Sequence, residues 1–306
     1  MSRLLVACVL VAALGAVAES AQTAPQIPRG SVLIDAVAFD KRDMPITDLK
    51  PDDFEVWIGH FRVPVDSLEL VTPASETRAG RLIVLLMDDI TVPLPDTARV
   101  QEIARRFVTR LLPGDQMAVV MLSEPSLEST NDPAVLRRQI DRYSVRATGI
   151  MRNEDLGRHV LKTLSGIASG LTEAGDGRKV IVGIGSGWMF DRPLPPPSAG
   201  ADLLPEWIEA IRALSRSHAA FYTIDPAGVG TRRADSGNAG FARETGGQAF
   251  LATNDTAGAA DRILRETGTY YLITVANPPV GGAGLRELEV KSLRRGVTLR
   301  ARRAIH

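Results

Sequence analysis

The segment Leu82–Met87 is an uninterrupted apolar run, and two carboxylates, Asp88 and Asp89, follow it directly. A short apolar run bounded by polar residues is typical of a strand that is buried on both faces of a parallel sheet. In open α/β sheets, ligands bind beyond the carboxyl ends of such strands. The two acids are therefore expected to mark a binding edge and, because carboxylates bind hard cations, a candidate metal site.

Strands and helices alternate along the centre of the chain. Apolar residues recur at helical spacing behind the first strand, where Asp96 is expected to cap the helix, and Asp132 with Pro133 predicts a second helix start. The predicted strands cover 82–87, 117–122, 180–184 and 219–224, and the predicted helices cover 96–112, 133–142, 155–171, 203–217, 238–245 and 255–267. This order predicts an α/β fold with a doubly wound, mostly parallel sheet and helices on both faces.

The two flanks of this region have a different pattern. Residues 31–72 and 269–304 alternate apolar and polar side chains over short stretches, which is typical of strands. Because a few isolated strands are only marginally stable, we expect the two flanks to pair into one small β-domain, with the α/β domain of residues 81–268 inserted between them. In the alternative layout, the C-terminal strands extend the central sheet.

The N-terminus has the features of a secretory signal peptide over residues 1–18. A basic residue, Arg3, precedes the apolar stretch Leu4–Leu14, and Ala16 and Ala18 form a cleavage motif. The stretch is too short for a membrane span. The mature chain is expected to begin after Ala18 with a disordered lead-in over 19–30, and to be secreted or periplasmic. A lipid anchor at Cys8 is not expected, because most of the apolar stretch follows the cysteine instead of preceding it.

Composition argues against several classes of function. Lys and Arg together number 36, as do Asp and Glu, so the chain has no net field to attract nucleic acid. Cleavage after Ala18 would remove Cys8, the single cysteine, and with it thiol chemistry. The four histidines, at positions 60, 159, 218 and 306, share no spacing typical of metal ligands.

Two enzyme patterns are incomplete. The sequence Gly183-x-Gly185-x-Gly187 follows a strand, as a phosphate-binding loop does, but no helix start follows it. Ser186 stands at a strand end like a hydrolase nucleophile, yet the surrounding Gly-Ile-Gly-Ser-Gly differs from Gly-x-Ser-x-Gly, and only the terminal His306 follows Asp225. An α/β hydrolase therefore stays an alternative, and we expect a protein that is not an enzyme.

Several segments together resemble one family. These segments are Val32–Val56, Arg81–Asp89, Leu112–Val120, Tyr222–Pro226, Glu244–Gly247, Tyr270–Ile273 and Val297–Arg302. Their order and spacing are similar to those of the secreted von Willebrand factor A (VWFA)-related proteins common in Acidobacteria. The resemblance implies a von Willebrand A-like α/β domain with flanking β segments, secreted or periplasmic, without an established enzymatic activity.

Domains of this type often carry a metal-ion-dependent adhesion site. Its first loop has the pattern Asp-x-Ser-x-Ser, which supplies one carboxylate and two hydroxyl ligands. Counted from Asp88, both hydroxyl positions hold apolar residues; counted from Asp89, they hold Thr91 and Pro93. The resemblance thus implies a first loop that keeps one hydroxyl of two.

The remaining ligands of such a site are a threonine from a second loop and an aspartate at a later strand end. Thr148 could supply the first, and Ser186 stands where the family has the aspartate. One carboxylate and two hydroxyls make a thin shell for Mg²⁺ or Mn²⁺. We therefore interpret the chain as a non-enzymatic protein–protein interaction module with a degenerate adhesion site and no resident cofactor. A divalent-cation-dependent adhesion domain with a working Mg²⁺ site is the alternative.

Four side chains are given roles at this edge. Because neighbours on a strand point in opposite directions, Asp88 and Asp89 cannot easily share a site. One of them is expected to cap the loop or the following helix, and the other to be solvated. Trp188, between a strand end and a proline-rich loop, and Asp225, at the end of a later strand, are predicted to contribute to the partner-binding edge.

Overall fold

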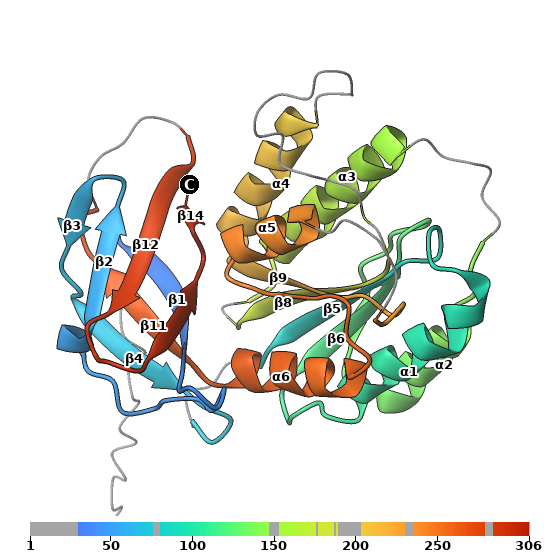
Figure 1. Cartoon of the computed structure of the whole chain (residues 1–306), viewed down its shortest axis with the longest axis horizontal. Helices are drawn as coiled ribbons and strands as arrows, with labels where there is room; N and C mark the ends of the chain where they lie inside the picture. Colours follow the sequence, from blue (N-terminus) through green and yellow to red (C-terminus); the bar gives the residue numbers. More distant parts are fainter. Residues whose placement is uncertain are drawn as a thin grey trace, which may run out of the picture.

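The structure is a computed structural model. It describes residues 30–75, 80–146, 153–175, 177–186, 188, 203–229, 236–278 and 284–305. The predictions for the signal peptide, for Cys8 and for Thr148 lie outside these residues. Figure 1 shows two lobes: an α/β lobe with a central sheet, and a lobe built mainly from strands.

The central sheet of the α/β lobe has six strands in the order β10-β9-β8-β5-β6-β7. Their bounds are β5 (Leu82–Met87), β6 (Gln116–Met121), β7 (Ser129–Thr130), β8 (Lys179–Ile184), β9 (Ala219–Ile224) and β10 (Ala249–Phe250). All neighbouring pairs are parallel except β6 and β7. The predicted mixed α/β architecture with a mostly parallel sheet is confirmed, and the apolar run of β5 lies at its centre.

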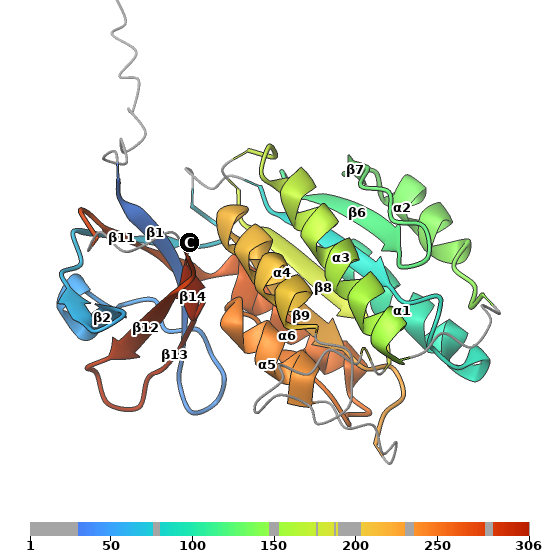
Figure 2. The ribbon, with the colours of Figure 1, turned by 90° about the horizontal axis from the view of Figure 1, so that it is seen from above.

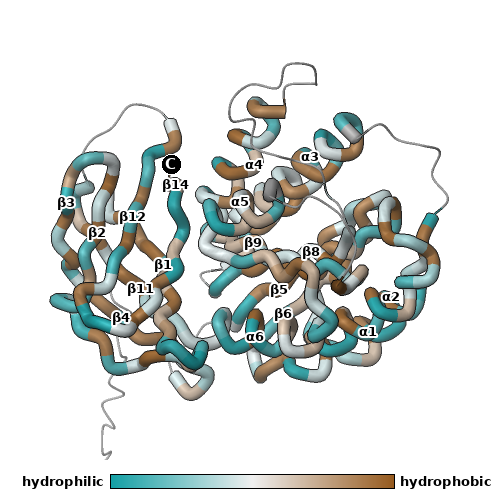
Figure 3. Tube along the Cα trace, viewed as in Figure 1, coloured by the Kyte–Doolittle hydropathy of each residue, from teal (hydrophilic) through white to brown (hydrophobic). Residues whose placement is uncertain are grey.

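Helices cover both faces of this sheet, as Figures 1 and 2 show. One set comprises α1 (Thr97–Val108), α2 (Pro133–Asp141) and α6 (Thr256–Gly268); the other comprises α3 (Asn153–Leu171), α4 (Leu204–Arg216) and α5 (Ser236–Glu244). The side chains of β5 divide between the two cores: Ile83 and Leu85 pack with the first set, and Val84 and Leu86 with the second. This alternation is the two-residue period of a strand. Apolar segments accordingly gather on the central strands in Figure 3.

The two predicted helix caps have different outcomes. Asp132 caps α2 as expected, because its carboxylate accepts a hydrogen bond from the backbone N–H of Ala134 at 2.7 Å. Asp96 occupies the capping position of α1, but its side chain makes no capping hydrogen bond. A 3-10 turn over Leu94–Asp96 leads into α1 and changes the backbone conformation there, so the predicted role of Asp96 is wrong.

The β lobe consists of two antiparallel four-stranded sheets in the orders β13-β1-β11-β4 and β14-β12-β2-β3. Their bounds are β1 (Val32–Phe39), β2 (Phe54–Ile58), β3 (Phe61–Val63), β4 (Ser67–Val71), β11 (Tyr270–Val275), β12 (Arg286–Ser292), β13 (Thr298–Ala301) and β14 (Ala304–Ile305), with a 3-10 turn (Pro51–Asp53) before β2. Strands from the two ends of the chain pair with each other: β1 with β11 and β13, β4 with β11, and β2 with β12. Of the two layouts considered, the paired one is observed.

Buried arginines line the base of the α/β lobe, on the side that faces the β lobe. Arg81 donates to Asp115 from both Nε (3.1 Å) and Nη2 (2.5 Å). The Arg178 guanidinium lies 4.4 Å from the ring centre of Tyr270 on β11 and 3.6 Å from Asp35 on β1. The contacts of Arg178 join the two lobes at the amino ends of the central strands, opposite the candidate site.

Candidate functional site

Three neighbouring strands end at the same edge of the central sheet, and each delivers a polar residue there. Asp88 follows β5, Ser186 lies two residues after β8, and Asp225 follows β9. The ladder continues past the strand ends, with Asp88 N donating to Ile184 O at 3.0 Å. The predicted residues Asp88, Thr91, Ser186, Trp188 and Asp225 therefore lie together, and all but the half-buried Thr91 are buried.

The Asp88 carboxylate is surrounded by hydrogen-bond donors. Its Oδ1 accepts from the backbone N–H groups of Ile90 (3.0 Å) and Thr91 (2.8 Å). Its Oδ2 accepts from the indole Nε1 of Trp188 at 2.7 Å and contacts the hydroxyl of Thr91. A carboxylate has about four lone-pair sites, two on each oxygen. Four contacts from the protein therefore match these four sites.

The Thr91 hydroxyl has one hydrogen but two oxygen neighbours, because it also lies 2.6 Å from the backbone carbonyl of Ser186. Its single hydrogen points to Asp88 Oδ2 or to the Ser186 carbonyl, or is shared between the two acceptors. Burial raises the pKa of Asp88, while the hydrogen bonds from Thr91, Ile90 and Trp188 oppose that rise.

Trp188 folds back over β8 onto two glycines. A Cβ added at Gly183 would lie 2.3 Å from Cζ3 of Trp188, and one at Gly185 would lie 2.8 Å from Nε1 of Trp188. The ring also packs against Phe221, with centroids 6.1 Å apart. The glycines therefore provide the space for the indole. Trp188 is only 1% exposed, so its predicted role as a partner-contact residue is wrong.

Asp89 points away from Asp88, as predicted for neighbours on a strand, but it is not solvated. It is 1% exposed, and its carboxylate accepts from the backbone N–H of Ser123 (2.9 Å) and from the Ser123 hydroxyl (2.5 Å). Arg146 Nε lies 3.3 Å from the same carboxylate. The prediction that one of the two acids is solvated is therefore wrong.

Sequence reasoning missed three residues of this network: Ser123, Arg146 and Tyr143. Tyr143 donates its hydroxyl hydrogen to the backbone carbonyl of Asp88 at 2.7 Å. A signal for Ser123 exists in the register, because Met87 of β5 pairs with Met121 of β6. If the same register is continued by two residues beyond each strand, Asp89 and Ser123 lie opposite each other.

The Ser186 hydroxyl is hydrogen-bonded and buried, so a substrate has no access to it in this conformation. The hydroxyl donates to Asp225 Oδ1 at 2.8 Å, and the same oxygen accepts from the backbone N–H of Ala227 at 2.9 Å. Ser186 has no exposed surface, and Asp225 is also buried, so its predicted role as a partner-contact residue is wrong. A nucleophile needs a base within reach and access to substrate. His159, on α3, instead bonds to the carbonyl of Leu122 at 2.8 Å.

Among the residues that the structure describes, no group of three His, Cys, Asp or Glu side chains is placed to hold a metal ion. None of the described helices combines the length and the apolar character that a membrane span requires. No protein-family model matches the sequence, and no curated protein matches it.

Proposed function

We propose that this chain is a secreted or periplasmic protein–protein interaction module with a von Willebrand A-like α/β domain. In this proposal it is not an enzyme. Hydrogen bonds from Ile90, Thr91 and Trp188 to Asp88, here called the plug, occupy the place of an adhesion-type metal ion. The observation that supports the proposal is the Asp88 carboxylate, whose lone pairs are all engaged by Thr91, Ile90 and Trp188. A metal ion would have to displace a buried indole to bind there.

Titration with Mg²⁺ or Mn²⁺ tests the plug. We expect the melting temperature of the mature chain to stay constant up to millimolar metal, because a ligand stabilises a protein only if it binds the folded state. Calcium serves as a control for non-specific ionic effects. A melting temperature that rises with Mg²⁺ or Mn²⁺ and saturates would contradict the plug.

That result would favour the second candidate, a divalent-cation-dependent adhesion domain. One observation speaks for it: the oxygens of Asp88, Thr91 and Ser186 converge at one sheet edge, with Thr91 Oγ1 2.6 Å from the Ser186 carbonyl. Mg²⁺ prefers oxygen ligands of this kind. Mn²⁺ or Mg²⁺ would then be its cofactor, and Trp188 would have to move away from Asp88.

The proposal keeps the partner at this edge of the sheet but assigns the contact to other residues. Two large apolar side chains are exposed around it: Leu94, after β5, is 71% exposed, and Val229, after β9, is 65% exposed. Arg99 of α1 donates to the carbonyl of Pro226 at 3.0 Å and so ties the two loops together. Exposed apolar side chains near a rim of polar groups are typical of protein contacts.

Substitution of Leu94 and Val229 by aspartate should weaken capture of the partner at least tenfold, because apolar contacts at the centre of an interface each contribute about 1–2 kcal/mol. The mature chain and the variant would be immobilised and incubated with the native envelope fraction, and bound proteins quantified by mass spectrometry. Leu293→Asp is the matched control, since Leu293 is 55% exposed on the β lobe. If capture of the partner fell equally in the control, or did not fall in the double variant, the partner would not bind at this edge.

A further inference from the structure

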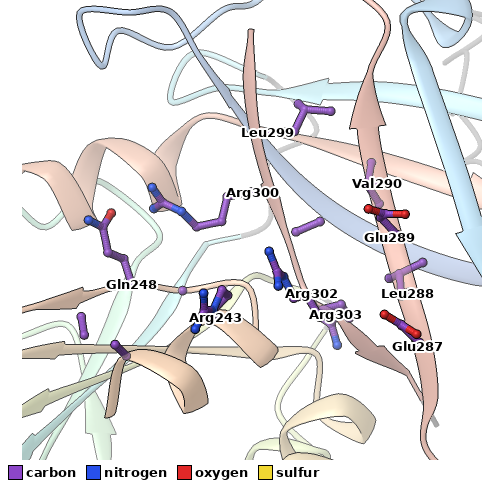
Figure 4. A pocket seen from close by; sticks show the side chains of 14 residues that line it. Arg243, Gln248, Glu287, Leu288, Glu289, Val290, Leu299, Arg300, Arg302 and Arg303 are labelled. Carbon is purple, nitrogen blue, oxygen red and sulfur yellow. The ribbon is translucent and has the colours of Figure 1, made fainter. Parts of the chain in front are cut away.

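A groove runs along the junction of the two lobes, away from the site described above. Its volume is about 450 Å³, which falls in the range of sites for small ligands. One wall comes from α5 and β10 of the α/β lobe, and the other from β12, β13 and the turn after β13. Figure 4 shows Arg243 and Arg302 close together between these walls, with Arg300 and Gln248 beside them.

The groove contains more positive than negative side chains. Arg243, Arg300, Arg302 and Arg303 line it, against Glu287 and Glu289. Arg300 is neutralised by Glu266, with Nη1 to Oε2 at 2.5 Å, and Glu289 by Lys291 at 2.8 Å. Arg243 and Arg303 are exposed, and neither guanidinium has an ion pair within the described part of the chain.

Arg302 adds a buried positive charge to the groove. Its side chain is 5% exposed, its Nη1 donates to the carbonyl of Ser215 at 3.2 Å, and its Nε has no hydrogen-bond partner in the described residues. The nearest carboxylate, on Asp35, is 4.0 Å away and is shared with the buried Arg178. Two buried guanidiniums thus face one carboxylate, and a buried charge without full compensation is costly.

An anion in the groove would supply the missing negative charge. Guanidinium groups bind carboxylate and phosphate oxygens through paired N–H donors. The accessible Arg243 and Arg303 can contact such a group directly, while Arg302 contributes positive potential from below. Glu287, which also lines the groove, would repel a ligand with many charges, such as a nucleic acid.

We propose that the inter-lobe groove is a binding site for a ligand with a single carboxylate or phosphate group, held by Arg243 and Arg303 above Arg302. Because the walls belong to different lobes, the bound ligand also bridges the α/β lobe and the β lobe. This site is independent of the Asp88 cluster and of the partner edge. It predicts that a small anion stabilises the protein against thermal unfolding.

The test uses the mature chain and two probes: inorganic phosphate, and N-acetylglycine as a carboxylate of the peptide type. Calorimetric titration and thermal melting at low ionic strength should give saturable binding and a matching rise in melting temperature for at least one probe. Binding of one probe alone identifies the phosphate or the carboxylate as the natural group. Binding of both supports the shared chemistry.

Arg243→Gln should weaken binding of the effective probe about tenfold, which is typical of losing a charge-assisted hydrogen bond, and adding Arg303→Gln should abolish it. Both side chains are exposed, so the variants should fold normally. Arg137→Gln, on the exposed face of α2 at the far end of the central sheet, is the matched control and should leave binding unchanged. Failure of both probes to bind, or equal binding by the double variant, would overturn the proposal.

Discussion

Replacement of Asp115 by alanine should lower the free energy of unfolding by about 3–5 kcal/mol, the typical cost of leaving one member of a buried ion pair alone. Arg81 is 2% exposed, and Asp115 accepts from its Nε, its Nη2 and its backbone N–H, as well as from the N–H of Leu112. Without the carboxylate, the guanidinium keeps, among the described residues, the Leu264 carbonyl and the Thr267 hydroxyl as partners. Denaturation by urea, monitored by circular dichroism, measures the change.

The control is the pair Arg105–Asp141, which joins α1 to the end of α2 at 2.6 Å with both side chains about half exposed. Because solvent screens such a pair, Asp141→Ala should cost less than about 1 kcal/mol. Similar losses in Asp115→Ala and Asp141→Ala would show that burial of the Arg81 pair does not determine its strength.

The contribution of the same ion pair to the free energy of unfolding should depend on pH. Although burial acts to raise it, the hydrogen bonds and the charge of Arg81 hold the pKa of Asp115 below its usual value of 3.8. An acid with a lowered folded-state pKa stabilises the fold above its unfolded pKa and loses that contribution as the pH falls through the folded value. The gap in stability between the parent and Asp115→Ala should therefore be constant near neutrality and shrink once the pH falls below 3.8.

Removal of the indole by Trp188→Ala should cost about 3–5 kcal/mol, because it leaves a cavity where a large side chain is almost fully buried. It also removes the Nε1 donor of Asp88. Trp188→Phe separates the two effects, since the phenyl ring fills most of the space but cannot donate. We expect it to cost about 1–3 kcal/mol, the penalty for an unsatisfied buried acceptor. Urea denaturation of both variants provides the measurement.

Trp57→Phe is the control for Trp188→Phe, because the Nε1 of Trp57 makes no hydrogen bond to any residue that the structure describes. It should cost less than the change at Trp188. If Trp188 excludes metal from Asp88, Mg²⁺ should stabilise Trp188→Phe more than the parent chain. Equal behaviour of the two tryptophan variants, with and without Mg²⁺, would mean that the indole N–H has no special role.

The sequence predicts the elements whose patterns are long. The apolar run of β5 and the helical spacing of α1, α3 and α4 extend over enough residues to show their periods. The strands β7, β10 and β14 have two residues each, too few to show any period. They form because longer neighbours offer free edges to pair with, which is a property of the folded sheet.

For the candidate site, the sequence predicts the edge and the opposite directions of Asp88 and Asp89, but not their burial. Burial depends on residues that approach from elsewhere: Trp188 covers Asp88, and Arg146 with Ser123 covers Asp89. The glycines at 183 and 185 partly match a phosphate-binding loop in the sequence, but in the structure they make room for the indole of Trp188. The resemblance to VWFA-related proteins predicts which residues would be ligands in a working site. In the structure, Thr91 and Trp188 donate to Asp88, and Thr91 contacts the Ser186 carbonyl.

The pairing of β4 with β11 sets an order of events during synthesis. Val71, the last residue of β4, pairs with Tyr270, the first residue of β11, so the chain leaves and re-enters the β lobe at adjacent points. β1 and β4 cannot pair with β11 and β13 until the whole α/β lobe has been made, although β2 and β3 can already pair with each other. The α/β lobe is contiguous and can close first, whereas β1 and β4 keep unpaired edges in the meantime. A ribosome-stalled chain that ends before Tyr270 should therefore expose these strands to chaperones and proteases.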